Sequence, residues 1–152
     1  MEETGENAFL RAAGVDDIWL LYDWANDPLV RQNSFTTAPI ARQTHEAWFG
    51  RMMSDDSTRQ YIYMVGEKAV GQIRIALDPS GEEAEIGYSI AAPYRGRGHG
   101  RRMLVLLEEK MREDLPDLKR LTARVKENNI ASAKAFEHTG YERQCIVYER
   151  RL

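Results

Sequence analysis

The residues best suited to chemistry lie in one short glycine-rich segment, Arg95 to Gly100. Glycine occupies every second position in it: Gly96, Gly98 and Gly100. The cationic side chains within or next to it are those of Arg95, Arg97, Arg101 and Arg102. Glycine lets the backbone approach a ligand closely, and a helix that starts there directs N–H groups and its positive dipole end at anions. The segment therefore predicts a phosphate-binding loop.

The spacing of the glycines excludes two common phosphate loops. A dinucleotide fingerprint needs G-x-G-x-x-G with an acidic residue about 20 positions later, and a P-loop needs G-x-x-x-x-G-K-[ST]. The sequence instead reads R-x-x-G-x-G from Arg95 to Gly100, between an apolar stretch at 84–92 and a helical pattern. A loop whose glycines serve turn geometry alone is the alternative interpretation.

Composition limits the class of protein. The 152 residues are 43% hydrophobic and 30% charged, which is typical of one soluble globular domain, here residues 1–152. A pI near 5.7 argues against a nucleic-acid partner. Cys145 is the single cysteine, interpreted as a small buried residue of a late strand, and no cluster has metal-ligand spacing. Without an apolar leader or membrane span, the sequence predicts a cytoplasmic protein.

The elements around the loop follow from periodicity. Alternating β-rich runs predict strands at 9–12, 61–65, 69–76, 84–92, 121–125 and 141–150. Spacings of three and four predict helices at 15–25, 42–53, 103–115 and 130–139. Leu29 to Pro39 is interpreted as a loop or broken helix. The resulting order is β-α-α-β-β-β-α-β-α-β.

A second motif accompanies the loop. Asn129-x-x-Ser132-x-x-x-Phe136-x-x-x-Gly140-Tyr141 lies about 30 residues after it. The two motifs, in this order and on these elements, resemble the GNAT N-acetyltransferase superfamily over nearly the whole chain. The resemblance implies an α+β fold, with a mixed, mostly antiparallel sheet flanked by helices, in a single domain.

The resemblance also implies acetyl-CoA as cosubstrate. Its pyrophosphate would lie on the loop, and its pantetheine arm and thioester on the strand before the loop. The cofactor-binding residues so implied are Tyr88, Ser89, Ile90, Arg95, Gly96, Arg97, Gly98, His99, Gly100, Arg101, Asn129, Ser132 and Phe136.

Acetyl transfer to an amine needs a base, because an alkylammonium group has a pKa of about 10. Glu85 is the candidate, since a glutamate at a similar place serves many GNAT relatives; a solvated strand carboxylate is the alternative. Many relatives carry a tyrosine at the position of Phe136, whose hydroxyl protonates the departing thiolate. Phenylalanine cannot do so, which leaves Tyr141, Tyr88 or a water as the proton donor.

The acceptor is predicted from residues 26–35. With Pro39, Ile40, His45, Trp48 and Phe49, this region resembles acetyltransferases of nucleotide-linked deoxyamino sugars, as in pseudaminic acid biosynthesis. Arg31, Asn33 and Ser34 are the candidate substrate-binding residues, with Arg31 holding the diphosphate. The same region is similar to ribosomal-protein N-terminal acetyltransferases, so a peptide or other small amine is the alternative.

Two further expectations complete the interpretation. A module that binds acetyl-CoA without turnover is a second alternative, because fold is a poor guide to activity. A homodimer is a possible assembly, and neither a membrane nor a nucleic acid is expected as a partner.

Overall fold

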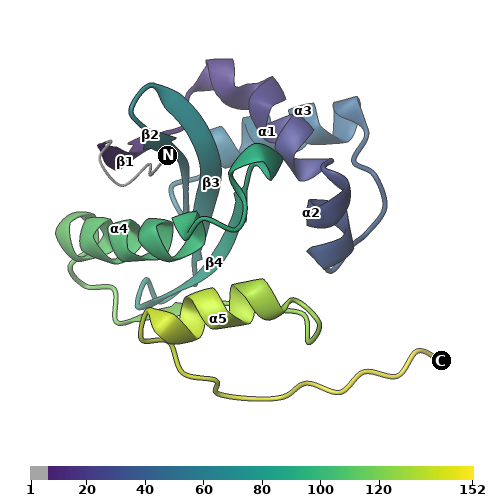
Figure 1. Ribbon diagram of the computed structural model, residues 1–152, viewed down its shortest axis with the longest axis vertical. Helices are drawn as coiled ribbons and strands as arrows, with labels where there is room; N and C mark the ends of the chain where they lie inside the picture. Colours follow the sequence, from purple (N-terminus) through teal and green to yellow (C-terminus); the bar gives the residue numbers. More distant parts are fainter. Residues whose placement is uncertain (1–6) are drawn as a thin grey trace.

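Five strands form one sheet in the order in which they occur in the chain (Figure 1). The computed structural model describes residues 7–152. The strands are β1 (Ala8–Ala12), β2 (Thr58–Val65), β3 (Lys68–Leu77), β4 (Glu83–Ile90) and β5 (Arg120–Thr122). All neighbours are antiparallel except β4 and β5, which are parallel. The predicted mixed, mostly antiparallel sheet is confirmed.

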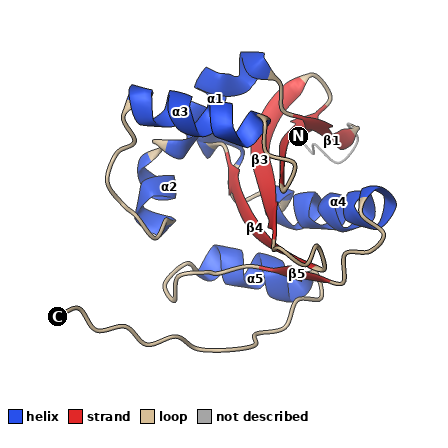
Figure 2. Cartoon of the chain, turned by 180° about the vertical axis from the view of Figure 1, so that it is seen from behind, coloured by secondary structure: helices blue, strands red, loops and turns tan. Residues whose placement is uncertain are grey.

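Helices cover both faces of this sheet (Figures 1 and 2). They are η2 (Val15–Asp17), α1 (Ile18–Ala25), α2 (Pro28–Asn33), α3 (Arg42–Met53), η3 (Ala92–Tyr94), α4 (His99–Asp114) and α5 (Ile130–His138). Side chains of α1 and α3 pack in one core cluster, and those of α4 and α5 in another. None of the helices within residues 7–152 combines the length and the apolar character that crossing a membrane requires.

The two-residue period of the strands separates these two clusters. Tyr63, Ile73 and Ile86 face α4 and α5, where Met103, Leu104, Leu107 and Met111 meet them with at most 2% of their surface exposed. Ile62, one position along from Tyr63, faces Leu21 and Phe49 on the other side. A helix was predicted at 103–115 from the helical spacing of its apolar residues, and the structure confirms it within α4.

Three predicted segments differ from the structure. Leu29 to Pro39 contains the short helix α2 before its loop, because Asp27 caps the N–H groups of Leu29 and Val30. The strand predicted at 121–125 ends at Thr122. The strand predicted at 141–150 is wrong: that segment forms no strand.

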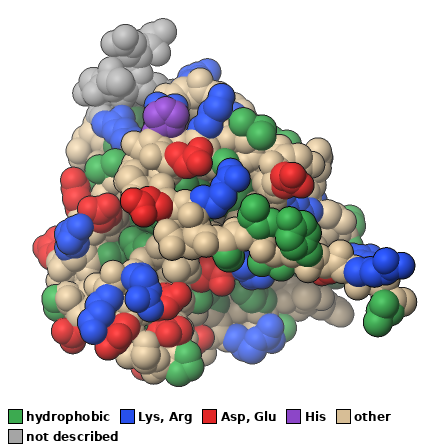
Figure 3. Space-filling view, turned by 90° about the horizontal axis from the view of Figure 1, so that it is seen from below, with side chains coloured by type: hydrophobic (Ala, Val, Ile, Leu, Met, Phe, Trp, Pro, Cys, Tyr) green, Lys and Arg blue, Asp and Glu red, His purple; other side chains and the backbone are tan. Residues whose placement is uncertain are grey.

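The terminal segment leaves the body of the molecule instead of pairing with β5 (Figures 1 and 2). Its apolar side chains lie in solvent, including Ile146, Val147 and Tyr148. Cys145 is exposed there as well, so its interpretation as a buried residue is wrong. In the space-filling view, acidic and basic side chains are interspersed over much of the visible face, and a narrow extension projects from one side (Figure 3).

Candidate functional site

The glycine-rich loop connects β4 to the N-terminus of α4. Gly96 and Gly98 have φ of 76° and 84°, a left-handed conformation that costs other residues about 1–2 kcal/mol. A Cβ at either glycine would meet no atom within 4 Å, so the backbone there is open to a ligand. Helix α4 begins without a side-chain cap hydrogen bond, and the N–H groups of a first helical turn lack partners within their helix. This arrangement suits a phosphate group.

The Arg95 side chain turns away from that anion site. Its Nε donates to the carbonyl of Ile90 at 3.0 Å, and its Nη2 donates to Oδ1 of Asp27 at 3.0 Å. Asp27 is also the N-cap of α2. Arg95 thus fixes the loop against β4 and α2, and its guanidinium is already engaged by protein groups.

His99 lies at the start of α4 with its ring in the core. The residue is 4% exposed, Nδ1 is 2.9 Å from the hydroxyl of Tyr63, and the ring meets that of Tyr94 edge-on. The buried imidazole therefore anchors the start of α4, next to the loop, to Tyr63 of β2.

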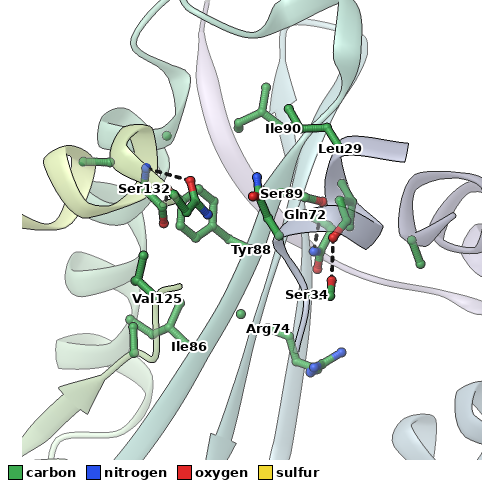
Figure 4. Close-up of a pocket in the computed structure, with 18 of the residues that line it drawn as sticks. Leu29, Ser34, Gln72, Arg74, Ile86, Tyr88, Ser89, Ile90, Val125 and Ser132 are labelled. Atoms are coloured by element: carbon green, nitrogen blue, oxygen red, sulfur yellow. Dashed lines mark hydrogen bonds between the residues drawn. The ribbon is translucent and has the colours of Figure 1, made fainter. Parts of the chain in front are cut away.

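A polar contact joins β4 to α5 beside the loop. The Tyr88 hydroxyl donates to Ser132 Oγ at 3.1 Å, and Asn129 Oδ1 accepts from the Ser132 N–H at 3.3 Å (Figure 4). The Phe136 ring lies edge-on to Tyr88, with centroids 5.7 Å apart. Gly100 packs beside the Tyr88 ring, where a Cβ would make an ordinary contact at 3.5 Å. Burial raises the pKa of Tyr88, which keeps its phenol protonated at neutral pH.

The edge of β4 opens where β5 stops. Pairing between the two strands covers only residues 83–85 and 120–122. Beyond that point residues 86–90 line a cavity of about 1370 Å³. Backbone groups of an open strand edge can bind an extended ligand as an added strand would, so this edge fits a linear amide-containing arm.

A polar network crosses the sheet on the α1–α3 side. Gln60 Nε2 donates to Gln72 Oε1 at 2.8 Å, and Gln72 Nε2 donates to Ser89 Oγ at 3.1 Å. Figure 4 shows Gln72, Ser89 and Arg74 on one side of the sheet and Tyr88 on the other. The sequence interpretation missed Gln60, Gln72 and Arg74. Gln72 and Arg74 alternate with the apolar Ile73 and Ile75, which was a readable signal, whereas Gln60 is a polar residue before an apolar run.

Glu85 lies at the last position of β4 that pairs with β5, where the cavity begins. Its Oε2 accepts from Arg124 Nε at 2.8 Å, and 46% of its side chain is exposed. The Arg124 guanidinium stacks on the Phe35 ring at 4.9 Å. The candidate base therefore faces the cavity and water, within an ion pair.

Tyr141 lies apart from the other predicted site residues. It is not among the residues that line the cavity, and its ring packs edge-on against Phe136. Among residues 7–152, no group forms a hydrogen bond with its buried hydroxyl. Burial, together with the nearby carboxylate of Glu108, raises the pKa of Tyr141 to about 12. The structure does not bring this phenol to the place where a thiolate would depart.

Arg31, Asn33 and Ser34 line the cavity, but the Arg31 side chain is occupied. Its guanidinium donates to the carbonyls of Ala25 at 2.6 Å and Thr36 at 2.9 Å, and to Ser34 Oγ at 3.1 Å. Ser34 Oγ in turn donates to the Val30 carbonyl. Arg31 thus holds the loop after α2 in shape, which corrects its interpretation as a diphosphate ligand.

The cavity has a strong charge imbalance. Among the described residues that line it, Glu85 is the single acidic one. Eight basic side chains line it: Arg31, Arg51, Arg74, Arg95, Arg97, Arg101, Arg124 and Lys134. A chain with a net charge of −3 therefore concentrates positive charge where ligands would bind.

Comparison with known proteins agrees with this geometry. Residues 8–142 match the acetyltransferase (GNAT) domain family. A solved domain from Methanocaldococcus jannaschii DSM 2661 is 25% identical, with a TM-score of 0.79 over 91% of this chain and 90% of that one. A search of curated proteins gave no significant match.

Two further structures share the fold at lower identity. Spermidine N-acetyltransferase from Vibrio cholerae, in complex with CoA and spermine, is 18% identical, with a TM-score of 0.81 over 93% of this chain and 85% of that one. RimL, a ribosomal L7/L12 α-N-protein acetyltransferase in complex with CoA, is 19% identical, with a TM-score of 0.72 over 86% and 77%. The chain belongs to the acetyltransferase (GNAT) family, and it is an acetyl-CoA-dependent N-acetyltransferase.

Proposed function

We propose that the protein acetylates the amino group of a nucleotide-linked deoxyamino sugar. The observation that carries this proposal is the charge of the cavity, with eight basic side chains and one carboxylate. Residues of α3, β3 and the segment after β5 contribute Arg51, Arg74 and Arg124, beyond the glycine-rich loop. An acceptor that carries a diphosphate suits such a surface, whereas a polycationic amine would be repelled by it.

The donor would bind along β4 and the loop. The backbone of Gly96 and Gly98, with the first turn of α4, would hold the pyrophosphate of acetyl-CoA. Asn129 and Ser132 would form the α5 side of the site, and the open edge of β4 would pair with the pantetheine arm. An N–H group of that edge would also stabilise the oxyanion of the tetrahedral intermediate, because it is fixed before the reaction begins.

Glu85 would remove the proton from the acceptor ammonium, directly or through a water. It is the acidic residue of the cavity, and the cavity begins at its position on β4. The neutral amine would then attack the thioester carbonyl carbon, its nitrogen would lose a second proton to water, and the intermediate would collapse to the amide as the carbon–sulfur bond breaks. Arg124 holds the carboxylate in place at 2.8 Å.

Tyr88 would supply a proton to the departing thiolate. Its phenol lines the cavity beside Phe136 and is fixed by Ser132. A coenzyme A thiol with a pKa of about 8.5 is a tolerable leaving group. Proton donation by Tyr88 would therefore accelerate the reaction without being essential to it.

Release of coenzyme A from acetyl-CoA, measured with a panel of amines, tests this proposal. The panel contains an amino-sugar nucleotide, the same amino sugar without the nucleotide, spermidine, and peptides with ribosomal-protein N-termini. The amino-sugar nucleotide should have the highest kcat/KM. Faster turnover of a peptide would replace the proposal with protein N-terminal acetylation, and binding of acetyl-CoA without turnover of any amine would favour a binding module.

The homodimer remains a prediction. Light scattering of the purified protein tests it, since one chain has a mass of 17.5 kDa and a dimer has twice that mass. A mass of one chain at micromolar concentration would contradict it.

A further inference from the structure

Arg74 is a cation on the wall of the cavity. It lies on β3, opposite Gln60 of β2 and Gly87 of β4. Its guanidinium carbon is 5.3 Å from the centre of the Trp48 ring on α3. Figure 4 shows its side chain on the same side of the sheet as Gln72 and Ser89. The strand and the Trp48 ring together fix the position of this charge.

The guanidinium of Arg74 has no anionic partner in the structure. Within residues 7–152 no carboxylate lies within 4.0 Å of it, and it makes no hydrogen bond. The charge of Glu85 acts on it from a distance, but the carboxylate of Glu85 is paired with Arg124 at 2.8 Å. Burial lowers the pKa of Arg74, which shows that its charge is partly removed from water. Five N–H donors are therefore unused.

Three other arginines of the same cavity have protein partners, and Arg51 and Arg101, whose side chains have none among the described residues, are exposed, whereas Arg74 is partly buried. Arg31 and Arg95 donate to backbone carbonyls and Asp27, and Arg124 is paired with Glu85. A partly buried charge without a partner is costly, and a bound oxyanion recovers that cost through charge-assisted hydrogen bonds. Space for such a group exists in the cavity that Arg74 and Gly87 both line, and Gly87 lacks a side chain that would lie between Arg74 Nη2 and that space, a Cβ there being 3.7 Å from Nη2.

We propose that Arg74 is the anion-binding residue of the acceptor site, so that the acceptor is an amine that also carries a phosphate or carboxylate group. This inference rests on the proposed acetyl transfer and deepens it by naming the residue that selects the acceptor. It gives Arg74 the role that the sequence had assigned to Arg31. Amines that carry only positive charge, such as spermidine, are then poor acceptors, because they leave the guanidinium without a partner.

The first test measures binding and needs no turnover. The protein is saturated with CoA, which occupies the glycine-rich loop, and is then titrated calorimetrically with UDP or with succinate. Wild-type protein should bind at least one of them. Arg74→Gln should weaken that binding by roughly tenfold or more, and Arg74→Lys, which keeps the charge without the planar donor pair, by less.

Arg112→Gln is the matched control. Arg112 lies on α4 outside the cavity with 78% of its side chain exposed, so this change removes the same charge without touching the site. Tighter binding of UDP identifies the anion as a phosphate, and tighter binding of succinate identifies it as a carboxylate. Failure of wild-type protein to bind any of these anions overturns the inference, even if Arg74→Gln does not fold.

The second test separates the inference from the proposed function. Acetyl transfer is measured with an amino-sugar nucleotide and with the same amino sugar lacking the nucleotide. Arg74→Gln should raise KM for the first by roughly tenfold and leave KM for the second unchanged. An equal effect on both acceptors, or efficient turnover of spermidine, overturns the inference while acetyl transfer stands. If UDP binding depends on Arg74 but no amine is acetylated, the subsite stands and the acceptor proposed above is wrong.

Discussion

The two faces of the sheet are built from the same strands but differ in chemistry. The face toward α4 and α5 is mostly apolar, with Tyr63, Ile73 and Ile75 fully buried, and its polar groups include the Tyr88 hydroxyl bonded to Ser132. The face toward α1–α3 is apolar at Ile62, but it carries Gln60, Gln72, Arg74, Glu85 and Ser89. Polar side chains stabilise a core less than apolar ones do. The comparison indicates that the first face maintains the fold while the second carries the acceptor chemistry.

The arginines of the cavity show a related contrast. Arg31 and Arg95 use their donors on the protein itself, whereas Arg74 has its donors unused. Variants of the first pair should change the shape of the site, and variants of Arg74 should change which acceptor is chosen. The following variants test whether the two faces, and the two kinds of residue, are as separate as the structure indicates.

The largest effect is expected for Glu85→Gln. If Glu85 removes the proton of the acceptor, kcat should fall by about 10²-fold at neutral pH, equivalent to about 2.7 kcal/mol. The loss should shrink at high pH, where the neutral amine accumulates. Steady-state rates from pH 6 to 10 measure both effects.

Glu83→Gln is the matched control for this variant. Glu83 lies two positions earlier on β4, on the same face, and is paired with Arg120 at 2.9 Å but does not line the cavity. Its rate should equal that of the wild type. Wild-type turnover by Glu85→Gln would move proton removal to water or to another residue.

Arg31→Ala should lower stability and leave acceptor choice unchanged. The change removes the hydrogen bonds to the carbonyls of Ala25 and Thr36 and to Ser34 Oγ. Because this guanidinium is partly buried, the free energy of unfolding should fall by about 2 kcal/mol. Urea denaturation measures the loss. A selective rise in KM for nucleotide-linked acceptors, without a loss of stability, would return the role of anion ligand to Arg31.

Gly98→Val tests the glycine-rich loop, which is the proposed site of the acetyl-CoA pyrophosphate. The change places a branched side chain at a φ of 84°, at the start of α4, and acetyl-CoA affinity should fall by at least about tenfold, or 1.4 kcal/mol. Calorimetry measures the affinity. Gly81→Val is the control, because Gly81 has a φ of 74° and an equally open environment in the turn before β4. An equal fall in acetyl-CoA affinity in both variants would show that backbone strain is responsible. Wild-type affinity in Gly98→Val would show that the loop does not hold the cofactor.

The smallest effect is expected for Tyr88→Phe. Because the thiolate is a tolerable leaving group, kcat should fall only about three- to tenfold. Tyr141→Phe should keep the rate of the wild type, since its hydroxyl is buried without a partner outside the cavity. Single-turnover rates of both variants show which of the two tyrosines donates the proton. A greater loss in Tyr141→Phe would exchange the two assignments.

The sequence alone determined most of the fold and predicts the place of the donor site. Periodicity located α1, α3, α4, α5 and the first four strands, because burial on one face repeats every two or 3.6 residues. The glycines of the loop predicted its left-handed backbone, because only glycine adopts a φ near 80° without strain. Their confirmation required no knowledge of distant contacts.

Only the tertiary structure decided which arginine faces a ligand. Arg31 and Arg74 are alike in sequence, but one is surrounded by carbonyls at 2.6–3.1 Å and the other lies beside Trp48 and Gly87. The segment at 141–150 has the alternation of a strand yet lacks a partner, because β5 ends at Thr122 and a strand needs a neighbour to satisfy its backbone. Both outcomes depend on residues far apart in the chain, and a local pattern contains no information about them.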